Sequence, residues 1–453
     1  MDRRRLLSAL ASVGAAGLAG CLSVDSAPMA TDSPAPLSVP EMNVPENVDV
    51  PTEQTEQYVA GNVDFGLALL DRLADESPNS NRFVSPYSIG VALAMTYAGA
   101  RGDTRTEMAE AMRFTPNGED LHRSVAALRA DLPLSDPDES NAASESGTAT
   151  ASEETENGAP LRLVGANALW GQAEFPFRED FAEKLNRYFD GGLGRVDFEE
   201  NPDEARRAVN GWVAERTREK VPELFPESTI DQRTRLVLTN AVYFRANWAE
   251  TFDEEKTEPK EFTTLDGTTS EVPTMHQKER FLFAEADGTK VLELPYASEN
   301  TDMALLLPPR GEFREFERDL DAERLGELLD ATEKMEVKVR VPRFEFRSSL
   351  ELSSRLAAMG VPTAFTSGAN FDGMAEGDAD ANLALDSVRH EAYVRVDERG
   401  TEAAAATGVE AAFLGYTESQ ATFAADRPFL FVIRHRPTDA PLFLGRVADP
   451  TAD

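Results

Sequence analysis

Apolar positions change their spacing along the chain, from helical spacing in the first half to strand-like spacing in the second. Val59, Val63, Leu67, Leu70 and Leu73 recur every three or four residues, which predicts an amphipathic first helix. Comparable patterns predict further helices at residues 86–99, 104–112, 119–131, 178–188, 202–218, 313–329 and 348–359.

Short apolar runs typical of β-strands dominate the second half. They predict strands at residues 161–170, 281–283, 291–295, 303–307, 335–346, 390–396, 428–435 and 442–447, with a hairpin between the last two. Residues 236–244 are almost continuously apolar, which is typical of a strand buried on both faces, and Asn240 within them would need buried hydrogen-bond partners. This order predicts an α+β fold with large, mostly antiparallel sheets.

Residues 397–428 form a long segment between two predicted strands, and loops of this length are usually functional or disordered. In its first half small or apolar residues occupy the odd positions, whereas Glu402 and Glu410 occupy even ones. As a strand, this segment would place no charge in a core. An Ala-rich surface helix is the alternative, because alanine is the best helix former.

The charge balance narrows the classes of partner. The 453 residues include 81 acidic and 45 basic ones, for a net charge of −36, which would repel nucleic acid and anionic membranes. Only 8 of the basic residues are lysine, and an acidic, lysine-poor surface resembles proteins of salt-loving archaea. An acidic protein of a mesophile is the alternative.

The N-terminal residues resemble a twin-arginine export signal with a lipobox, comprising residues 1–21. Arg3, Arg4 and Arg5 precede an apolar run too short to span a membrane, and the run ends at Cys21, which we expect to be lipidated. Cys21 is the only cysteine, so no intramolecular disulfide or catalytic thiol is available; a leftover buried cysteine is the alternative. We expect an exported protein, held at the cell surface by this lipid or extracellular.

Two polar, low-complexity segments flank predicted structure. Residues 22–55 are rich in Pro, Asp, Thr and Ser, which predicts a disordered acidic linker, and residues 132–160 predict a solvated acidic insert. The folded domain is expected at residues 56–450.

Catalytic motifs are missing from the sequence. His390-Glu391 begins like the zinc motif HExxH, but Val394 stands where the second histidine is needed. The chain has no GxSxG, Walker or CxxC motif, so we expect no enzyme, no cofactor and no metal site.

Several stretches, in order along the chain, resemble the serpin family of serine protease inhibitors, and the resemblance covers nearly all of the folded part. They are Phe83-Val84-Ser85-Pro86-Tyr87-Ser88, Asn167-Ala168-Leu169-Trp170, Asn210-x-Trp212-Val213, Leu238-Thr239-Asn240-Ala241, Asp426-Arg427-Pro428-Phe429 and Phe443-Leu444-Gly445-Arg446. The resemblance implies nine helices, three sheets and an exposed reactive centre loop, here residues 398–427. In this family a serine protease cleaves the loop and is trapped as an acyl-enzyme, while the loop inserts into the central sheet.

The resemblance also implies roles for individual residues. The segment that enters the sheet first, called the hinge, comprises Glu398, Gly400, Thr401, Glu402, Ala403, Ala404, Ala405 and Ala406. A polar cluster beneath the sheet, called the shutter, comprises Ser85, Ser88, Asn240 and His390; from the residues alone the two serines would be helix caps. A second group at the top of the sheet, called the breach, comprises Trp248, Arg343 and Glu398, with a predicted ion pair between the last two.

The reactive bond depends on the direction of counting. Counting from Gly400 places it at Leu414-Gly415, whereas counting back from Pro428 places it near Thr417, so Phe413, Tyr416 and Thr417 remain alternatives. The apolar candidates favour chymotrypsin-like or subtilisin-like target proteases over trypsin-like ones.

We expect a monomer whose partner is the target protease. A heparin-type polyanion is not expected, because residues 119–131 offer only His122, Arg123 and Arg129 among acidic neighbours. A non-inhibitory, lipid-tethered surface binding protein with the serpin fold is the alternative function.

Overall fold

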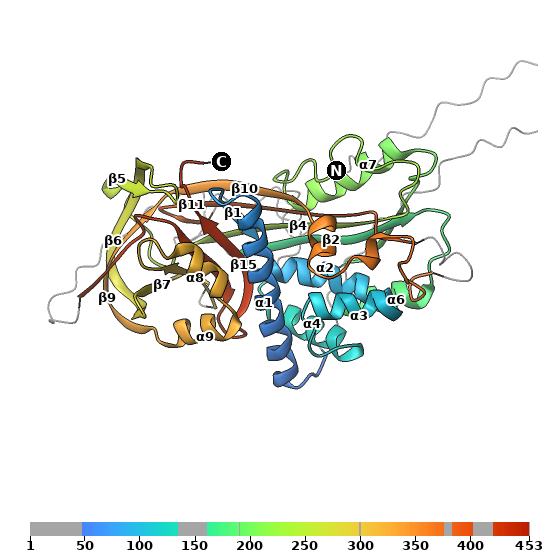
Figure 1. Ribbon diagram of the computed structural model, residues 1–453, viewed down its shortest axis with the longest axis horizontal. Helices are drawn as coiled ribbons and strands as arrows, with labels where there is room; N and C mark the ends of the chain where they lie inside the picture. The colour runs from blue at the N-terminus through green and yellow to red at the C-terminus, as the bar shows by residue number, and fades with distance from the viewer. Residues whose placement is uncertain are drawn as a thin grey trace, which may run out of the picture. The chain divides into compact units, whose positions relative to one another are not determined.

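The computed structural model describes residues 48–134, 161–189, 191–298, 300–375, 383–401 and 420–452. Within these residues the chain forms nine α-helices and two sheets, of six and nine strands (Figure 1). In the described ranges, none of the helices combines the length and the apolar character that crossing a bilayer requires. The predicted α+β fold with large sheets is confirmed.

Most predicted helices lie within a few residues of their expected bounds. α2 begins after Ser85, whose side chain accepts a hydrogen bond from the Ser88 amide, and Pro86 occupies its first turn. The helices are α1 (Thr52–Glu76), α2 (Pro86–Gly99), α3 (Gly102–Ala111), α4 (Glu119–Asp131), α6 (Glu179–Tyr188), α7 (Pro202–Arg216), α8 (Phe313–Asp319), α9 (Ala322–Asp330) and α10 (Ser353–Ala358).

The six-stranded sheet, called the central sheet below, carries the predicted site. Its strands, in spatial order, are β10 (Phe344–Glu351), β11 (Ser387–Asp397), β12 (Gly400–Thr401), β4 (Leu236–Asn247), β2 (Arg162–Gln172) and β3 (Leu193–Val196). α7 covers one face, whereas α2 packs beneath the other (Figure 1). β4 is therefore buried along almost its whole length, as its apolar sequence predicts.

The nine-stranded sheet joins what the family resemblance implied to be two separate sheets. β6 (Thr269–Ala286) pairs with β5 (Glu258–Thr263) at one end and with β7 (Thr289–Pro295) at the other. This one long strand makes the hydrogen bonding continuous, so two sheets are present in the described chain rather than three. The other strands are β1 (Arg82–Val84), β8 (Thr301–Leu307), β9 (Glu333–Pro342), β13 (Gln420–Ala424), β14 (Phe429–His435) and β15 (Ala440–Val447), the last two forming the predicted hairpin.

Some element bounds differ from the prediction for local reasons. The predicted helix at 313–329 is two helices, because the Asp321 side chain accepts from the Arg324 amide and starts α9. Residues 348–351 continue β10, in which alternate residues are buried. α1 begins at Thr52, inside the predicted linker. The apolar pattern did not predict this start, because the first turn of α1 is polar.

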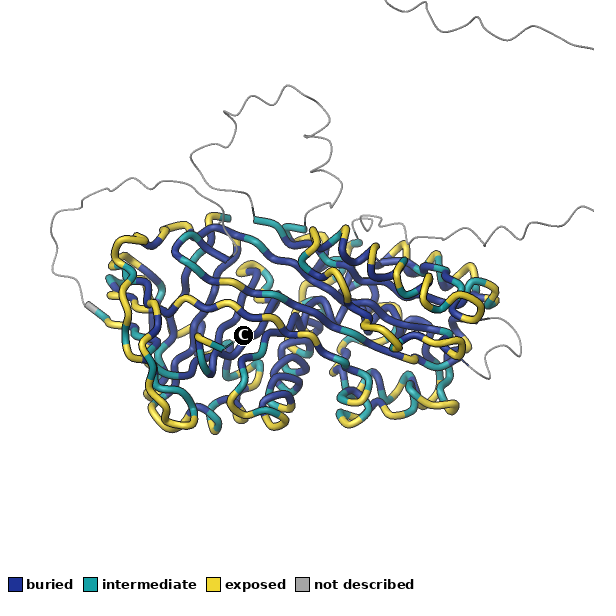
Figure 2. The backbone as a smooth tube through the Cα atoms, turned by 90° about the horizontal axis from the view of Figure 1, so that it is seen from above, coloured by how far each residue is buried: buried dark blue, intermediate teal, exposed yellow. Residues whose placement is uncertain are grey.

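The core fills the space between the sheets and the helices. In Figure 2 the strands that cross the molecule are mostly buried, and exposed residues lie mainly in loops and at the rim. α2 is buried along its whole length beneath the central sheet. The central sheet is thus supported on both sides and has rigid neighbours for the site described below.

Candidate functional site

The central sheet is open at one end, where the start of the predicted loop has entered it. β11 and β4 pair directly in parallel from Ser387 and Val237 to Ala392 and Val242. Beyond that ladder the two strands part, and β12 lies between them, antiparallel to both. We call β12 together with the flanking ends of β11 and β4 the sheet mouth.

Gly400 is required by the close approach of β12 to β4. Its φ is +155°, and a Cβ atom there would lie 2.1 Å from the carbonyl oxygen of Ala246. Only glycine avoids both problems. The backbone reversal predicted for this residue therefore lies at the entrance to the sheet.

Thr401 is already buried in the sheet mouth, at 1% exposure. It lies opposite Val396 of β11 and Ala246 of β4, and its Oγ1 is 2.7 Å from the hydroxyl of Tyr296. The Tyr296 ring in turn stacks on Trp248, with 4.6 Å between ring centroids.

The predicted ion pair between Arg343 and Glu398 is present. Arg343 Nη2 lies 2.5 Å and Nε 2.7 Å from Oε1 of Glu398, which also accepts a hydrogen bond from Thr257. Burial alone would raise the pKa of Glu398, but the hydrogen bonds from Arg343 and Thr257 outweigh it and hold that pKa below its usual value. Trp248, the third breach residue, donates from Nε1 to the Asp397 carbonyl at 2.9 Å.

The four shutter residues meet beneath the closed part of the sheet, as expected. Asn240 Nδ2 donates to Ser88 Oγ at 2.7 Å, and Ser85 Oγ donates to the Leu442 carbonyl at 2.6 Å. His390 lies directly opposite Asn240 across the β11–β4 ladder, and Nδ1 is 2.5 Å from Asn240 Oδ1. All four residues are almost completely buried.

The partners of His390 define its tautomer. The Ser85 amide donates to Nε2 at 3.3 Å, so Nε2 carries no proton. Asn240 uses its amide nitrogen for Ser88 and Asn167, so its oxygen accepts from Nδ1–H. Burial lowers the pKa of His390 to about 3, which keeps the ring neutral.

Several residues of the site were missed by sequence reasoning. Asn167 Oδ1 accepts from both Ser88 and Asn240, and its position opposite Asn240 on the neighbouring strand was the available signal. Tyr296 and Thr257 gave no such signal, because their partners Thr401 and Glu398 lie more than a hundred residues away in the sequence.

Part of the predicted site lies outside the described residues. This part includes Cys21, the hinge residues Glu402 to Ala406, the reactive-bond candidates Phe413 to Thr417 and most of the acidic insert. The downstream part of the predicted loop includes a strand, because residues 420–424 form β13, which pairs in parallel with β9. The side chain of Phe423 is fully buried there.

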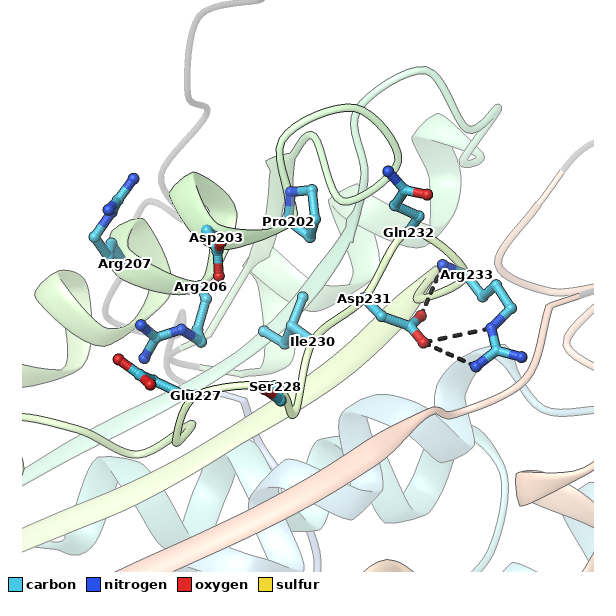
Figure 3. Close-up of a pocket in the computed structure, with 10 residues that line it drawn as sticks. All are labelled: Pro202, Asp203, Arg206, Arg207, Glu227, Ser228, Ile230, Asp231, Gln232 and Arg233. Atoms are coloured by element: carbon cyan, nitrogen blue, oxygen red, sulfur yellow. Dashed lines mark hydrogen bonds and ion pairs between the residues drawn. The ribbon is translucent and has the colours of Figure 1, made fainter.

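A surface pocket of about 780 Å³ lies between the start of α7 and residues 227–233 (Figure 3). Its lining is charged, but Arg206 pairs with Glu223, and Asp231 accepts hydrogen bonds from Arg233. None of its residues belongs to the sheet mouth or the shutter.

The structure defines a class: an α+β protein whose central sheet is closed at one end and holds the start of a long loop at the other. Similar proteins agree with this description. Residues 60–450 match the family described as Serpin (serine protease inhibitor). The chain therefore belongs to the serpin family, which is a family of protease inhibitors and not of enzymes.

Individual relatives cover most of the chain. The leukocyte elastase inhibitor of Bos taurus is 37% identical over 404 residues, which are 87% of this chain and 100% of that protein. An uncharacterized serpin-like protein of Thermococcus kodakarensis is 35% identical over 96% of each chain. The solved structure of human thyroxine-binding globulin has a TM-score of 0.73 and 29% identity, and the match covers 88% of this chain and 100% of that one.

Proposed function

We propose that the protein inhibits serine proteases by offering residues 402–419 as bait and inserting the cleaved loop into the central sheet. The observation that carries the proposal is β12, which lies between β11 and β4 in the antiparallel orientation that an inserted strand needs. Insertion would continue a strand that has already begun, adding backbone hydrogen bonds on both of its edges.

The register of β12 defines where each loop residue would go. Thr401 lies opposite Val396 and Ala246, and each step forward along the loop is one step back along both neighbouring strands. Thr407 would therefore arrive between His390 and Asn240. Those two strands are directly paired there in the present structure, so they must separate from about 4.8 Å to about twice that distance.

The side chains of the loop suit this register. Even residues of both β11 and β4 face the core, and the inserted partners of these residues would be the odd loop positions Ala403, Ala405, Thr407 and Val409. The even positions, including Glu402 and Glu410, would face outward. In this register Glu410 would lie between Ser387 and Val237, the first pair of the β11–β4 ladder. A bond cleaved at Leu414-Gly415 would therefore lie just beyond the inserted strand.

The bait sequence favours a chymotrypsin-like or subtilisin-like target. Phe413, Leu414 and Tyr416 are the apolar candidates for the residue that a protease's primary pocket binds, and no basic residue lies near them. Elastase inhibition is the activity named for a relative that this chain resembles over 87% of its length.

The proposal includes export as a lipoprotein. The N-terminal Arg-rich segment and Cys21 support attachment to the outer face of the membrane, where extracellular proteases act. A Cys21→Ser variant should be released into the medium, which immunoblotting of cells and medium would detect.

The inhibitory function is tested by incubating the protein with subtilisin and with chymotrypsin. A covalent complex that survives denaturing gel electrophoresis is expected, and mass spectrometry should find cleavage between residues 413 and 418. Protease whose active-site serine has been blocked is the control, because it cannot form the acyl bond. Cleavage without any complex, at every protease ratio tried, would favour the non-inhibitory alternative.

A further inference from the structure

Tyr296 lies between the two sheets, one residue after the end of β7. Its side chain is almost completely buried, at 1% exposure, and its hydroxyl reaches Thr401 in the sheet mouth. The contact joins residues that are 105 positions apart in the sequence, one that follows β7 of the nine-stranded sheet and one in β12 of the central sheet. The two buried hydroxyls depend on each other, because loss of either one leaves the other without a hydrogen bond in the core.

The Tyr296 ring has little freedom to move. It stacks on Trp248 with an interplanar angle of 8°, and the edge of Phe244 contacts it with 5.3 Å between ring centroids. The backbone is fixed too, since the Ala249 amide donates to the Pro295 carbonyl at 2.9 Å, and the Ala297 amide to the Asn247 carbonyl at 2.8 Å. Tyr296 is therefore attached to the end of β4, the strand that β12 pairs with.

Trp248 connects the same ring to the segment that leads into the hinge. Its indole Nε1 donates to the Asp397 carbonyl at 2.9 Å, and its backbone amide donates to the Arg399 carbonyl at 2.8 Å. Residues 397, 399 and 401 are thus all held by the Trp248–Tyr296 pair. Their backbone is defined before any protease binds.

We propose that Tyr296 is a positioning residue that holds Thr401 in the register of the inserted strand before the loop is cleaved. The inference rests on the proposed inhibitory function and deepens it. Thr401 has the same strand partners whether insertion has begun or is complete, so the hydrogen bond persists through the transition. Insertion then starts from an ordered end, and the entropy needed to order the first residues has already been lost.

The consequence concerns a competition between two rates. After the acyl bond forms, either the loop inserts and traps the protease, or water hydrolyses the bond and frees it. Removing one buried hydrogen bond changes an equilibrium constant by about 2- to 10-fold, so the ratio of ordered to disordered hinge should fall by that factor. Slower insertion should raise the ratio of cleaved inhibitor to covalent complex by up to a similar factor.

The test measures that ratio for four variants against a protease that the wild type traps. Tyr296→Phe and Thr401→Val each remove one hydroxyl and should each raise the ratio, by up to about 10-fold. Thr401→Ser keeps the hydroxyl and should retain the wild-type ratio. The double variant Tyr296→Phe/Thr401→Val should be no worse than the more affected single variant, because both remove the same bond.

Tyr97→Phe is the matched control. Tyr97 is also buried, and its hydroxyl accepts hydrogen bonds from Arg105 Nε and from the Gly118 amide, away from the central sheet. This variant should lower thermal stability but leave the ratio unchanged, which separates positioning from a general loss of stability.

Two results would overturn the proposal. One is a wild-type ratio for both Tyr296→Phe and Thr401→Val, and the other is an equal rise in Tyr97→Phe. Failure of the wild type itself to form a complex would instead refute the inhibitory function on which the proposal rests.

Discussion

His390 must stay neutral for the shutter to keep its hydrogen bonds. Protonation would add a proton at Nε2, which faces the Ser85 amide, so two donors would oppose each other. The cluster offers no carboxylate to compensate, because the described partners of His390 are Asn240 and Ser85. On the proposed function the same residues would have to separate during insertion, so this cluster would link folding stability with inhibition.

Acid should therefore destabilise the fold through His390. The pKa is about 3 in the folded protein and near its ordinary value of 6.5 when unfolded, so the unfolded state binds a proton first as the pH falls. The contribution is complete above pH 6.5 and is lost by about 1.4 kcal/mol per pH unit between 6.5 and 3. Urea unfolding of wild type and His390→Gln from pH 7 to 4.5 checks this.

The comparison of the two proteins isolates His390 from other titrating groups. Burial also lowers the pKa of His122, to about 4, but His122 is common to both proteins. The stability advantage of the wild type should shrink as the pH falls. An advantage that stays constant over this range would mean that His390 does not titrate as described.

Thr401→Arg should convert an inhibitor into a substrate. The side chain at this position lies between β11 and β4 and is 1% exposed. A buried charge without a partner there would cost roughly several kcal/mol. The hinge could then not remain in the sheet mouth, and gels should show cleaved protein in place of the covalent complex. Thr401→Ser, which keeps a small hydroxyl side chain at the same position, is the control and should still inhibit; an undiminished complex with Thr401→Arg would contradict insertion.

At the scale of elements, the register of β12 with β11 and β4 predicts contacts that form only on insertion. One step beyond Thr401, Glu402 would lie between Arg395 and Arg245, on the outward face of the sheet. Arg245 already faces Arg162 across the β2–β4 pair, and Arg162 is also near Arg218. Like charges on neighbouring strands are unfavourable, so an incoming carboxylate should be attracted.

Glu402→Arg should accordingly slow insertion and increase the share of cleaved inhibitor at low salt. Adding Arg395→Glu to the same chain should restore part of the complex, because opposite charges would again be neighbours. Gel quantification at low salt and at about 1 M salt, where screening acts within about 3 Å, gives the control. No recovery in the double variant, or an effect independent of salt, would contradict this register.

Local patterns predicted the elements better than they predicted the contacts between them. The bounds of α4 were correct because its apolar positions repeat regularly and acidic residues begin it. β13 was missed because Gln420–Ala424 is short and contains one strong apolar residue, Phe423. The shutter and the ion pair at Glu398 came from family resemblance, whereas the Tyr296–Thr401 contact depends on the packing of two sheets, which no periodicity encodes.

At the scale of the whole molecule, the strand between β11 and β4 at the sheet mouth is incomplete. β11 and β4 pair over Ser387–Ala392 and Val237–Val242, and β12 fills only the opposite end. Residues 393–395 and 243–245, between these two pairings, are not paired with one another within the described chain. On the proposed function, a complete strand would provide those groups with partners and bury the odd-numbered loop side chains, so we expect the inserted arrangement to be more stable than the uncleaved form.

Cleavage of the loop should therefore raise the melting temperature well above that of the intact protein. Insertion from Glu402 to Glu410 would replace the single β11–β4 ladder by two ladders, and each backbone hydrogen bond gained in the exchange would contribute about 0.5–1.5 kcal/mol net. For a domain of this size each kcal/mol shifts the midpoint by about 1 °C, so the increase should be on the order of ten degrees. Scanning calorimetry of intact and cleaved protein measures it, and Thr401→Arg is the control because its cleaved form should gain much less. A cleaved wild type that melts with the intact protein would show that the loop stays outside the sheet, and the mouth formed by β12 would then be a fixed feature of the fold.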